Sequence, residues 1–272
     1  MPKTLSVNEI INLVKETNLN DGNVIYIPSL QKEISVKPMT AVHLKNIIKT
    51  TVSGVFSNTI FNQSFYSILK DILPEDVNTE SLTLIDKIVM MLQLRILNVR
   101  PTVKIDMENV GNKDDKKEIE FNLSKIISKI KKYKFYFDSK IIESGQYKVE
   151  LQCPNVDQEF LFDRFFQIKH IDNIDENDKG QLKSLLGPLF LKEMAQYIKN
   201  VTIQTTAIDF YKLSVEQRTS IVEQFPSKLI TQILDSIDTV YGKQINDIIT
   251  VEKTIDDVTY KGTIDIDASL FA

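Results

Sequence analysis

The segment LTLIDKIVMMLQLRILNVRPTVKIDM, residues 82–107, contains a strongly apolar helical pattern followed by the pattern of a strand. One continuous apolar face of the helical part is formed by Ile85, Ile88, Val89, Leu92, Ile96 and Val99. The opposite face is also largely apolar, and a helix that is apolar nearly all round is normally buried in a core or against a partner. After Pro101 apolar and polar residues alternate, which predicts a strand. The segment therefore predicts a buried helix that leads directly into a sheet.

Asp86 and Arg95 are charged residues within this apolar pattern. They are nine positions apart, so at about 100° per residue they point to opposite sides of the helix and should not pair with each other. A buried guanidinium without a partner costs several kcal/mol. Arg95 therefore needs a partner from elsewhere in the chain or from a neighbouring subunit. We expect Arg95 to fix packing or assembly geometry rather than to act in catalysis, so Arg95→Ala should reduce soluble yield or abolish partner binding.

Residues 1–101 are predicted to form a helical region with short strands near its start. A capping box that begins at Ser6 predicts a first helix. The sequence VIYIPSLQKEISVKP, residues 24–38, predicts a strand, a turn and a second strand. Thr40 is the expected N-cap of the next helix, and a further helix with an apolar period near 3.6 should end at Pro74.

Residues 102–170 are predicted to form an antiparallel β-rich region. Two alternating stretches are joined by the polar sequence GNKDDKK, residues 111–117, which predicts a hairpin with a long tip. Alternation over 133–137 and again over 147–153 predicts further strands. One short helix is expected near 122–132.

Residues 171–272 are predicted to form a helical region with a terminal β-hairpin. A glycine followed by Pro188 should kink or split one of the helices. A second capping box begins at Ser214, and Gly242 is the expected end of the last helix. The closing hairpin should turn at Asp256 and the aspartate that follows it.

Together these patterns predict an α+β fold, with a helical N-terminal block, an antiparallel β-rich middle and a helical C-terminal block closed by a β-hairpin. The composition is that of an ordered globular protein, because 272 residues contain only 8 Gly and 8 Pro. The net charge is −4 and the pI is about 5.4, which does not favour binding to nucleic acid or to an anionic membrane. No apolar run approaches the length of a membrane span, and the N-terminus lacks a signal-peptide pattern. We expect a soluble protein made in the cytoplasm.

The residues that most enzymes need are scarce in this sequence. His43, His170 and Cys153 are the only histidines and cysteine, and they are too few and too scattered for a structural zinc site. Cys153 lies on the apolar phase of a strand pattern, where a free cysteine usually behaves as a small buried hydrophobe. No glycine-rich phosphate loop is present. We therefore expect no enzymatic activity, no cofactor and no metal; a hydrolase centred on Cys153 is an alternative, and it should lose activity on Cys153→Ser.

The sequence KIISKIKKYKFYF, residues 125–137, interleaves lysines with aromatic residues. Such a pattern can stack bases on a basic surface. Acidic residues flank the segment and the whole chain is not basic, so a charged face beside a strand is the preferred interpretation. A small nucleic-acid-binding module is the alternative from a different class, and salt-dependent binding of single-stranded nucleic acid would support it.

Several segments carry a resemblance to a known family. They are IYIPSLQKEISVKPMT (25–40), SFYSILKDIL (64–73), LTLIDKIVMMLQLRILNVRPTVKI (82–105) and LSVEQRTSIVEQFPSKLITQILDSI (213–237). Through them the chain, and residues 24–107 above all, resembles the baseplate hub proteins of T4-like contractile-tailed bacteriophages, a family that includes hub assembly factors. Asp86, Leu94 and Arg95 match the family's aspartate and Leu-Arg positions, with Leu92 opening the Leu-x-Leu-Arg motif. The family usually continues with Ser-Val-Gly, where this chain has Ile-Leu-Asn-Val.

The resemblance implies a non-enzymatic tail protein that is a component or an assembly factor of the central baseplate hub. Its implied partners are other baseplate hub and tail proteins, with self-association as a further expectation. It would be located in the tail baseplate of the virion and would be assembled in the host cytoplasm. Asp86, Leu92, Leu94 and Arg95 are then candidate structural or interface residues. A transient tail assembly chaperone that is absent from the virion is the alternative within this class.

Overall fold

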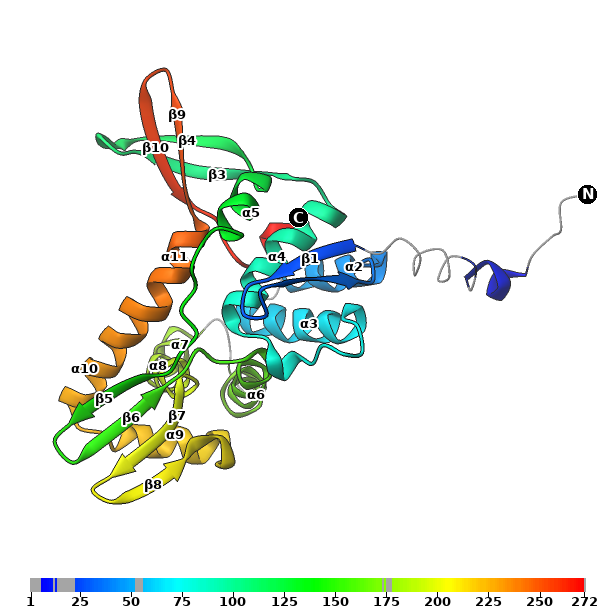
Figure 1. Cartoon of the computed structure of the whole chain (residues 1–272). Helices are drawn as coiled ribbons and strands as arrows, with labels where there is room; N and C mark the ends of the chain where they lie inside the picture. The colour runs from blue at the N-terminus through cyan, green and yellow to red at the C-terminus, as the bar shows by residue number, and fades with distance from the viewer. Residues whose placement is uncertain are drawn as a thin grey trace, which may run out of the picture.

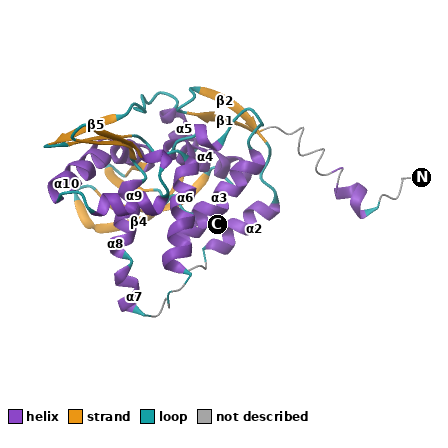
Figure 2. Cartoon of the chain, turned by 90° about the horizontal axis from the view of Figure 1, so that it is seen from below, coloured by secondary structure: helices purple, strands orange, loops and turns teal. Residues whose placement is uncertain are grey.

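The computed structural model describes residues 6–11, 13, 23–51, 56–172, 174 and 178–271. Within them the chain has the predicted α+β fold, in which one two-stranded and two four-stranded antiparallel sheets surround a group of helices (Figure 1). Helices α2, α3, α4 and α6 lie together in the middle, and the hairpin β1–β2 and the strand β5 lie on different sides of them (Figure 2).

The N-terminal region agrees with its prediction. Its elements are β1 (Asn23–Ile27), β2 (Lys32–Val36), α2 (Ala41–Thr50), α3 (Ser57–Ile72), η2 (Thr79–Ser81) and α4 (Leu84–Asn98). Thr40 caps α2 and Thr83 caps α4, each through a capping box. The helix predicted to begin at Ser6 also shows its capping box, since the backbone N–H groups of Ser6 and Glu9 each donate to the other's side chain. Residues 12 and 14–22 of that prediction lie outside the described residues.

Helix α4 is buried along most of its length, as its apolar pattern predicts. Every residue from Leu84 to Arg95 is buried, including both Leu92 and Leu94, which have no exposed surface. The largest hydrophobic cluster contains α4 and residues from all three predicted regions. One continuous core therefore runs through the chain with α4 inside it.

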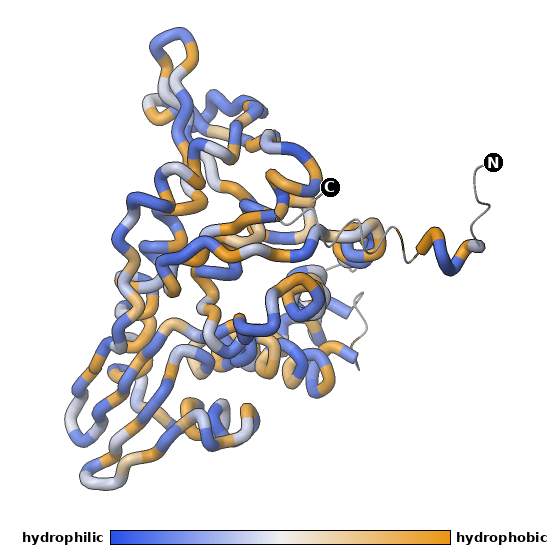
Figure 3. The backbone as a smooth tube through the Cα atoms, turned by 45° about the vertical axis from the view of Figure 1, so that its right-hand side comes forward, coloured by the Kyte–Doolittle hydropathy of each residue, from blue (hydrophilic) through white to orange (hydrophobic). Residues whose placement is uncertain are grey.

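The strand that follows α4 belongs to a sheet that joins the middle of the chain to its C-terminus. This sheet contains β3 (Thr102–Asn109), β4 (Asn112–Asn122), β9 (Thr250–Ile255) and β10 (Val258–Thr263), in the order β4-β3-β10-β9. Hydrophobic and hydrophilic positions alternate along β3, and the hairpin at the top of the tube in Figure 3 contains residues of both kinds. β10 pairs with β3 only at Tyr260, Lys261 and Gly262. The two hairpins are therefore joined over a short distance and diverge beyond it (Figure 1).

The prediction of a long hairpin tip over residues 111–117 is wrong. β3 and β4 are separated only by Val110 and Gly111, and the other polar residues of this segment belong to β4. They can form a strand because their side chains find partners: Lys116 pairs with Glu108, and other side chains of the segment also bond across the sheet. Polarity alone does not prevent a strand whose outer face is exposed.

The closing hairpin is confirmed at the predicted turn. Asp256 has φ 49° and Asp257 has φ 63°, so both central residues of the β9–β10 turn are left-handed. Two such residues define the type I′ turn, whose twist matches that of the flanking strands, and aspartate tolerates this conformation better than most residues.

The third sheet contains β5 (Lys140–Ser144), β6 (Tyr147–Leu151), β7 (Ile198–Ile203) and β8 (Thr206–Asp209), in that order. β6 confirms the strand predicted over 147–153. The hairpin β7–β8 was not predicted and lies within the region expected to be helical. The strand predicted over 133–137 is wrong: the aromatic residues at 133, 135 and 137 pack on one another instead of pairing in a sheet.

The other helices are α5 (Ser124–Ile130), α6 (Val156–Phe166), η3 (Gln167–Ile171), α7 (Lys179–Ser184), α8 (Leu186–Ala195), η4 (Phe210–Lys212), α9 (Val215–Glu223), α10 (Ser227–Ser236), η5 (Ile237–Gly242), α11 (Lys243–Ile249) and η6 (Ala268–Phe271). α5 and the capping box of α9 at Ser214 are confirmed. The split before Pro188 is confirmed too, because α7 ends at Ser184 and Pro188 lies in the first turn of α8, where its missing N–H is tolerated.

Two helical features differ from the prediction. α6 lies within the region expected to be β-rich; its many aromatic residues favour strands, but Asn155 caps it and apolar residues line one side. Gly242 does not end the last helix. It has right-handed backbone angles, with φ −59°, so the helix continues through η5 and α11 to Ile249. A glycine ends a helix at this position only when it adopts the left-handed conformation.

Candidate functional site

The first polar residue that α4 buries is Asp86, which fixes the start of the helix. The backbone N–H and the hydroxyl of Thr83 donate to Asp86 Oδ2 at 2.7 and 2.9 Å, and the backbone N–H of Ser29 donates to Asp86 Oδ1 at 2.8 Å. Burial raises the pKa of Asp86, although these hydrogen bonds oppose the rise. Asp86 therefore ties the turn between β1 and β2 to the N-terminus of α4.

Gln93 connects the middle of α4 to the same hairpin. Its side-chain oxygen accepts from the backbone N–H of Tyr26 at 2.8 Å, and its side-chain nitrogen donates to the carbonyl of Tyr26 at 2.9 Å. The amide thus satisfies both backbone groups of one β1 residue, so β1 is held against α4 at a fixed register.

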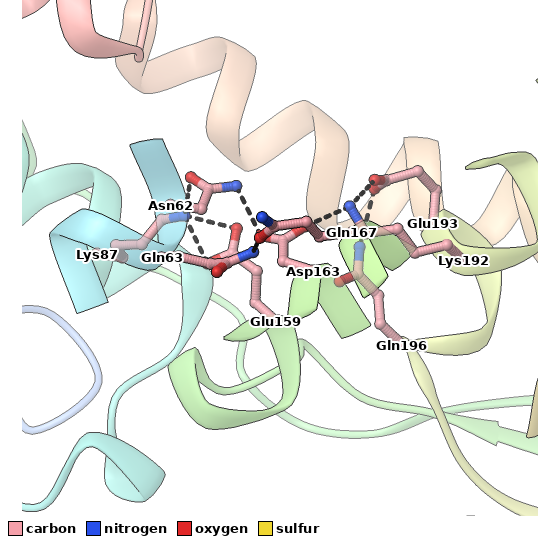
Figure 4. Close-up of polar contacts among 9 residues, drawn as sticks. All are labelled: Asn62, Gln63, Lys87, Glu159, Asp163, Gln167, Lys192, Glu193 and Gln196. Carbon is pink, nitrogen blue, oxygen red and sulfur yellow. Dashed lines mark hydrogen bonds and ion pairs between the residues drawn. The ribbon is translucent and has the colours of Figure 1, made fainter. Parts of the chain in front are cut away.

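Lys87 belongs to a network of buried charged residues between α3, α4, α6 and α8 (Figure 4). Its Nζ lies 2.5 Å from the carboxylate of Glu159 and donates to Asn62 Oδ1 at 3.0 Å. The amide nitrogen of Asn62 donates to Asp163 Oδ2 at 3.0 Å, and Lys192 Nζ lies 2.5 Å from Asp163 Oδ1. Asn62 therefore links two ion pairs into one network.

The network reaches the surface at the end of α8, where the side chain of Glu193 is 55% exposed. Lys192 also lies 3.2 Å from Glu193, whose carboxylate accepts from the side chain of Gln196. The carboxylates of Glu159, Asp163 and Glu193 thus face only two lysines. Burial raises the pKa of Glu159, and the nearby Asp163 raises it further against the effect of its lysine partner. Burial lowers the pKa of Lys192, but its carboxylate neighbours outweigh this and hold it above its ordinary value.

A cavity of about 430 Å³ lies beside this network. Asn62, Glu159 and Lys192 form part of its wall, and leucines of α7 and α8 form much of the rest. Both lysines of the network are already paired with carboxylates. The arrangement is suited to holding four helices at fixed positions, because removing either partner of a buried ion pair leaves an uncompensated charge.

Arg95 lies near the other end of α4 in a different environment. The side chain is only 2% exposed, and its Nη2 donates to the carbonyl of Thr102 at 3.3 Å. Nε and Nη1 have no hydrogen-bond partner among the described residues. Burial lowers the pKa of Arg95, and the positive charge of Arg100 lowers it further. As the helical geometry predicts, Asp86 does not pair with Arg95, so the guanidinium has a carbonyl partner and no carboxylate partner within the described chain.

A hollow of about 850 Å³ adjoins Arg95. It is bounded by β3, by the start of the chain that leaves β10, and by residues of the final turn η6. Charged side chains of both signs line it: Arg100, Lys104, Asp106, Glu108, Glu118, Lys261 and Asp265. The polar hollow and the unpaired guanidinium are therefore found at the same place.

The other sequence candidates have structural partners. Cys153 is buried, and burial raises the pKa of its thiol to about 12, so the reactive thiolate is disfavoured. His43 takes part in the capping box of α2 and lies 3.4 Å from Asp71. His170 packs beside Phe166, and burial lowers its pKa. In the described part of the chain, no three histidine, cysteine or acidic residues converge as metal ligands.

The lysine- and aromatic-rich segment 125–137 is also engaged within the fold. The hydroxyl of Tyr133 donates to Asp247, and Lys129 donates to the carbonyl of the same residue. Lys131 pairs with Glu33 on β2. The rings of Tyr133, Phe135 and Phe137 pack on one another, and the two phenylalanines also pack on the core, so they do not form an open platform. Across the described residues, no helix has the length and apolar character needed to span a bilayer.

Sequence reasoning singles out one residue near each end of α4 and misses the network between the helices. Asp86 and Arg95 were singled out because they interrupt an apolar pattern, and Lys87 interrupts it in the same way. Glu159 and Asp163 lie four residues apart on α6, but that helix was not predicted, so their common face was not apparent. A lysine inside an all-round apolar helix is the signal that could have indicated a buried acidic partner.

Comparison with known proteins gives one match. Searches of curated proteins and of solved structures found none. The family model described as T4 bacteriophage base plate protein matches residues 22–263, which include α4, its polar contacts and the whole charged network. A match over most of the chain, rather than over one motif, shows that the protein belongs to the T4 bacteriophage base plate protein family.

Proposed function

We propose that this baseplate protein is a non-enzymatic structural component of the central hub and acts through contacts with other hub and tail proteins. The observation that carries the proposal is the use of the polar residues on α4. Asp86 and Gln93 hold the β1–β2 hairpin, and Lys87 holds α3 and α6, so the segment that resembles hub proteins acts as a scaffold. Among the buried polar residues of α4, Arg95 alone has side-chain donors without a partner in the described part of the chain.

The chemistry of the buried charges supports a non-enzymatic role. Lys87 and Lys192 are paired with carboxylates, and the thiol of Cys153 is held in its neutral form by burial. A general base or nucleophile has to reach a substrate in the protonation state that its reaction needs. These groups instead satisfy one another inside the fold.

The test is quantitative mass spectrometry of purified phage particles and of tail assembly intermediates from infected cells. A fixed low number of copies in each particle is the expected result for a hub component, and its position in the tail baseplate follows from fractionating the particles. Presence in intermediates alone would instead identify an assembly factor that leaves before completion. Absence from both would contradict the proposal.

Two further expectations are tested on the purified protein. Self-association is measured by sedimentation over a range of concentrations. Binding to single-stranded nucleic acid is measured at low salt, where an electrostatic contribution is strongest. No binding at low salt is expected, because the rings of Tyr133, Phe135 and Phe137 are partly buried against one another, and Lys129 and Lys131 have partners within the fold.

A further inference from the structure

Among the residues that the structure describes, one edge of β3 has no strand neighbour over more than half of its length. β4 pairs with the whole of β3, but on the other side β10 pairs only with Met107, Glu108 and Asn109. The residues from Thr102 to Asp106 therefore have a strand on one side only.

The direction of the backbone groups along this open edge follows from contacts on both sides. Successive residues of an antiparallel strand direct their N–H and C=O groups to opposite edges. Val110 donates its N–H to the carbonyl of Thr259 in β10, and Arg95 reaches the carbonyl of Thr102 from outside the β3–β4 pair. Even-numbered residues of β3 thus face away from β4. Lys104, midway along the open part and in the lining of the hollow, therefore directs its N–H and C=O away from β4.

The hollow has the size and position for an added extended segment. Its volume of about 850 Å³ is at the upper end of the range of about 300–1,000 Å³ typical of ligand pockets. Two of its walls are the open part of β3 and the chain from Lys261 to Asp265 as it leaves β10, and Lys113 and Glu118 of β4 also line it. Gly262 keeps the two walls together at the closed end, because a Cβ there would lie 2.8 Å from Met107 Cγ and 2.9 Å from the carbonyl oxygen of Asp106.

The end of the hollow near α4 has a positive charge without a counter-charge. Arg95 is buried there with Nε and Nη1 unpartnered among the described residues, and Arg100 lies close enough to lower its pKa. Lys104 and Lys261, by contrast, are already paired with Glu118 and Glu252. A buried unpaired guanidinium is costly, and a carboxylate brought close to it removes much of that cost.

We infer that this hollow receives an extended, acidic segment of another baseplate protein, which adds a strand along Thr102–Asp106 and places a carboxylate beside Arg95 and Arg100. Main-chain hydrogen bonds to the open edge would supply affinity, and the charge pair would fix register. The acidic residues on the same walls, Asp106, Glu108 and Asp265, repel a continuous polyanion, so the observations favour a protein segment over nucleic acid. The inference rests on the proposed function, since it needs a neighbouring baseplate protein.

The first experiment places a photo-crosslinking amino acid at Lys261, in a phage whose own copy of the gene is inactive and is complemented by the variant. Lys148 is the matched control, because both lysines pair with a glutamate across a hairpin and their side chains are 55% and 53% exposed. Purified tails are irradiated, and the crosslinked peptides are identified by mass spectrometry. The expected result is a crosslink from position 261 to an acidic segment of a different baseplate protein, which position 148 does not form.

The second experiment removes the backbone donor without changing the fold elsewhere. Lys104→Pro deletes the N–H that faces the hollow, whereas Lys104→Ala changes only the side chain. Incorporation into particles should fall about tenfold for the proline variant and change less than about twofold for the alanine variant. Arg100→Glu, at an exposed residue, should lower incorporation by a similar factor, and Arg100→Lys should preserve it. Thermal unfolding of each purified variant identifies any that fail to fold.

The outcomes separate this inference from the proposed function. A crosslink only to this chain or to a second copy, or equal incorporation of all four variants, would overturn the inference and leave a hub component in place. If the wild-type protein were absent from both particles and assembly intermediates, the proposed function and the inference would both be contradicted.

Discussion

The two halves of α4 bury positive charges in opposite ways. Near its start, Lys87 lies within a network in which every lysine has a carboxylate partner. Near its end, Arg95 has one carbonyl partner and adjoins an open hollow. The first arrangement is complete within the chain and holds helices together. The second is incomplete, which is what we expect of a surface that is completed by another protein.

The largest effect on stability is expected when the charge of Lys87 is removed. Lys87→Met leaves Glu159 buried without its partner, so the free energy of unfolding should fall by about 3–5 kcal/mol. Urea unfolding of the purified protein measures it. The double variant Lys87→Met/Glu159→Leu is the control and should regain part of the loss. A single variant as stable as the wild type would show that the network does not hold the helices.

Gly262→Ala should have the next largest effect, because it acts where the two hairpins meet beside the hollow. The added methyl group would contact Met107 Cγ and the carbonyl of Asp106 at under 3 Å, so the strands must separate. We expect a loss of about 1–3 kcal/mol in the free energy of unfolding. Gly111→Ala is the matched control in the neighbouring turn, where the nearest atom is 3.5 Å away, and it should be nearly neutral.

Arg95→Met tests most directly whether Arg95 and Lys87 have different roles. Methionine keeps the buried stem and removes a charge that has no carboxylate partner in the described chain, so the free energy of unfolding should stay the same or increase. Incorporation into phage particles should nevertheless fall strongly. A loss of stability as large as that of Lys87→Met would mean that Arg95 acts in folding rather than in assembly.

The smallest effect concerns the pH dependence contributed by Asp86. Burial raises the pKa of Asp86 in the folded protein above its ordinary value of 3.8, so the folded state keeps its proton to a higher pH than the unfolded chain. The stability linked to this group should therefore fall as the pH rises from 3.8 through the folded pKa. Asp86→Asn does not titrate, so its unfolding free energy, measured by urea at several pH values, should lack this decline. If the unfolding free energy of both proteins changed with pH in the same way, the decline would not come from Asp86.

The sequence predicted α4, its burial and the opposite directions of Asp86 and Arg95, because an apolar helical period is a strong local signal. It also predicted the type of fold and the turn at Asp256. It did not predict α6, whose aromatic residues favour strands locally, or the passage of the last helix through Gly242. In both cases packing against the rest of the chain outweighs local preference.

The site was predicted less completely for the same physical reason. Glu159, Asp163 and Lys192 meet Lys87 only after α6 and α8 pack against α3 and α4. The hollow depends on where β10 stops pairing with β3, which is a property of the assembled sheet. The charged network and the hollow both depend on residues that are far apart in the sequence, so no local sequence pattern indicates them.

The β4-β3-β10-β9 sheet also has a consequence for folding during synthesis. β3 and β4 leave the ribosome early, but their neighbour β10 is translated more than a hundred residues later. Until then the edge of β3 that β10 will occupy remains open in the nascent chain, and such unpaired edges promote association with other chains. A stop codon before β9 should therefore be far more damaging than the loss of two short strands suggests, because it leaves β3 with an unfinished sheet.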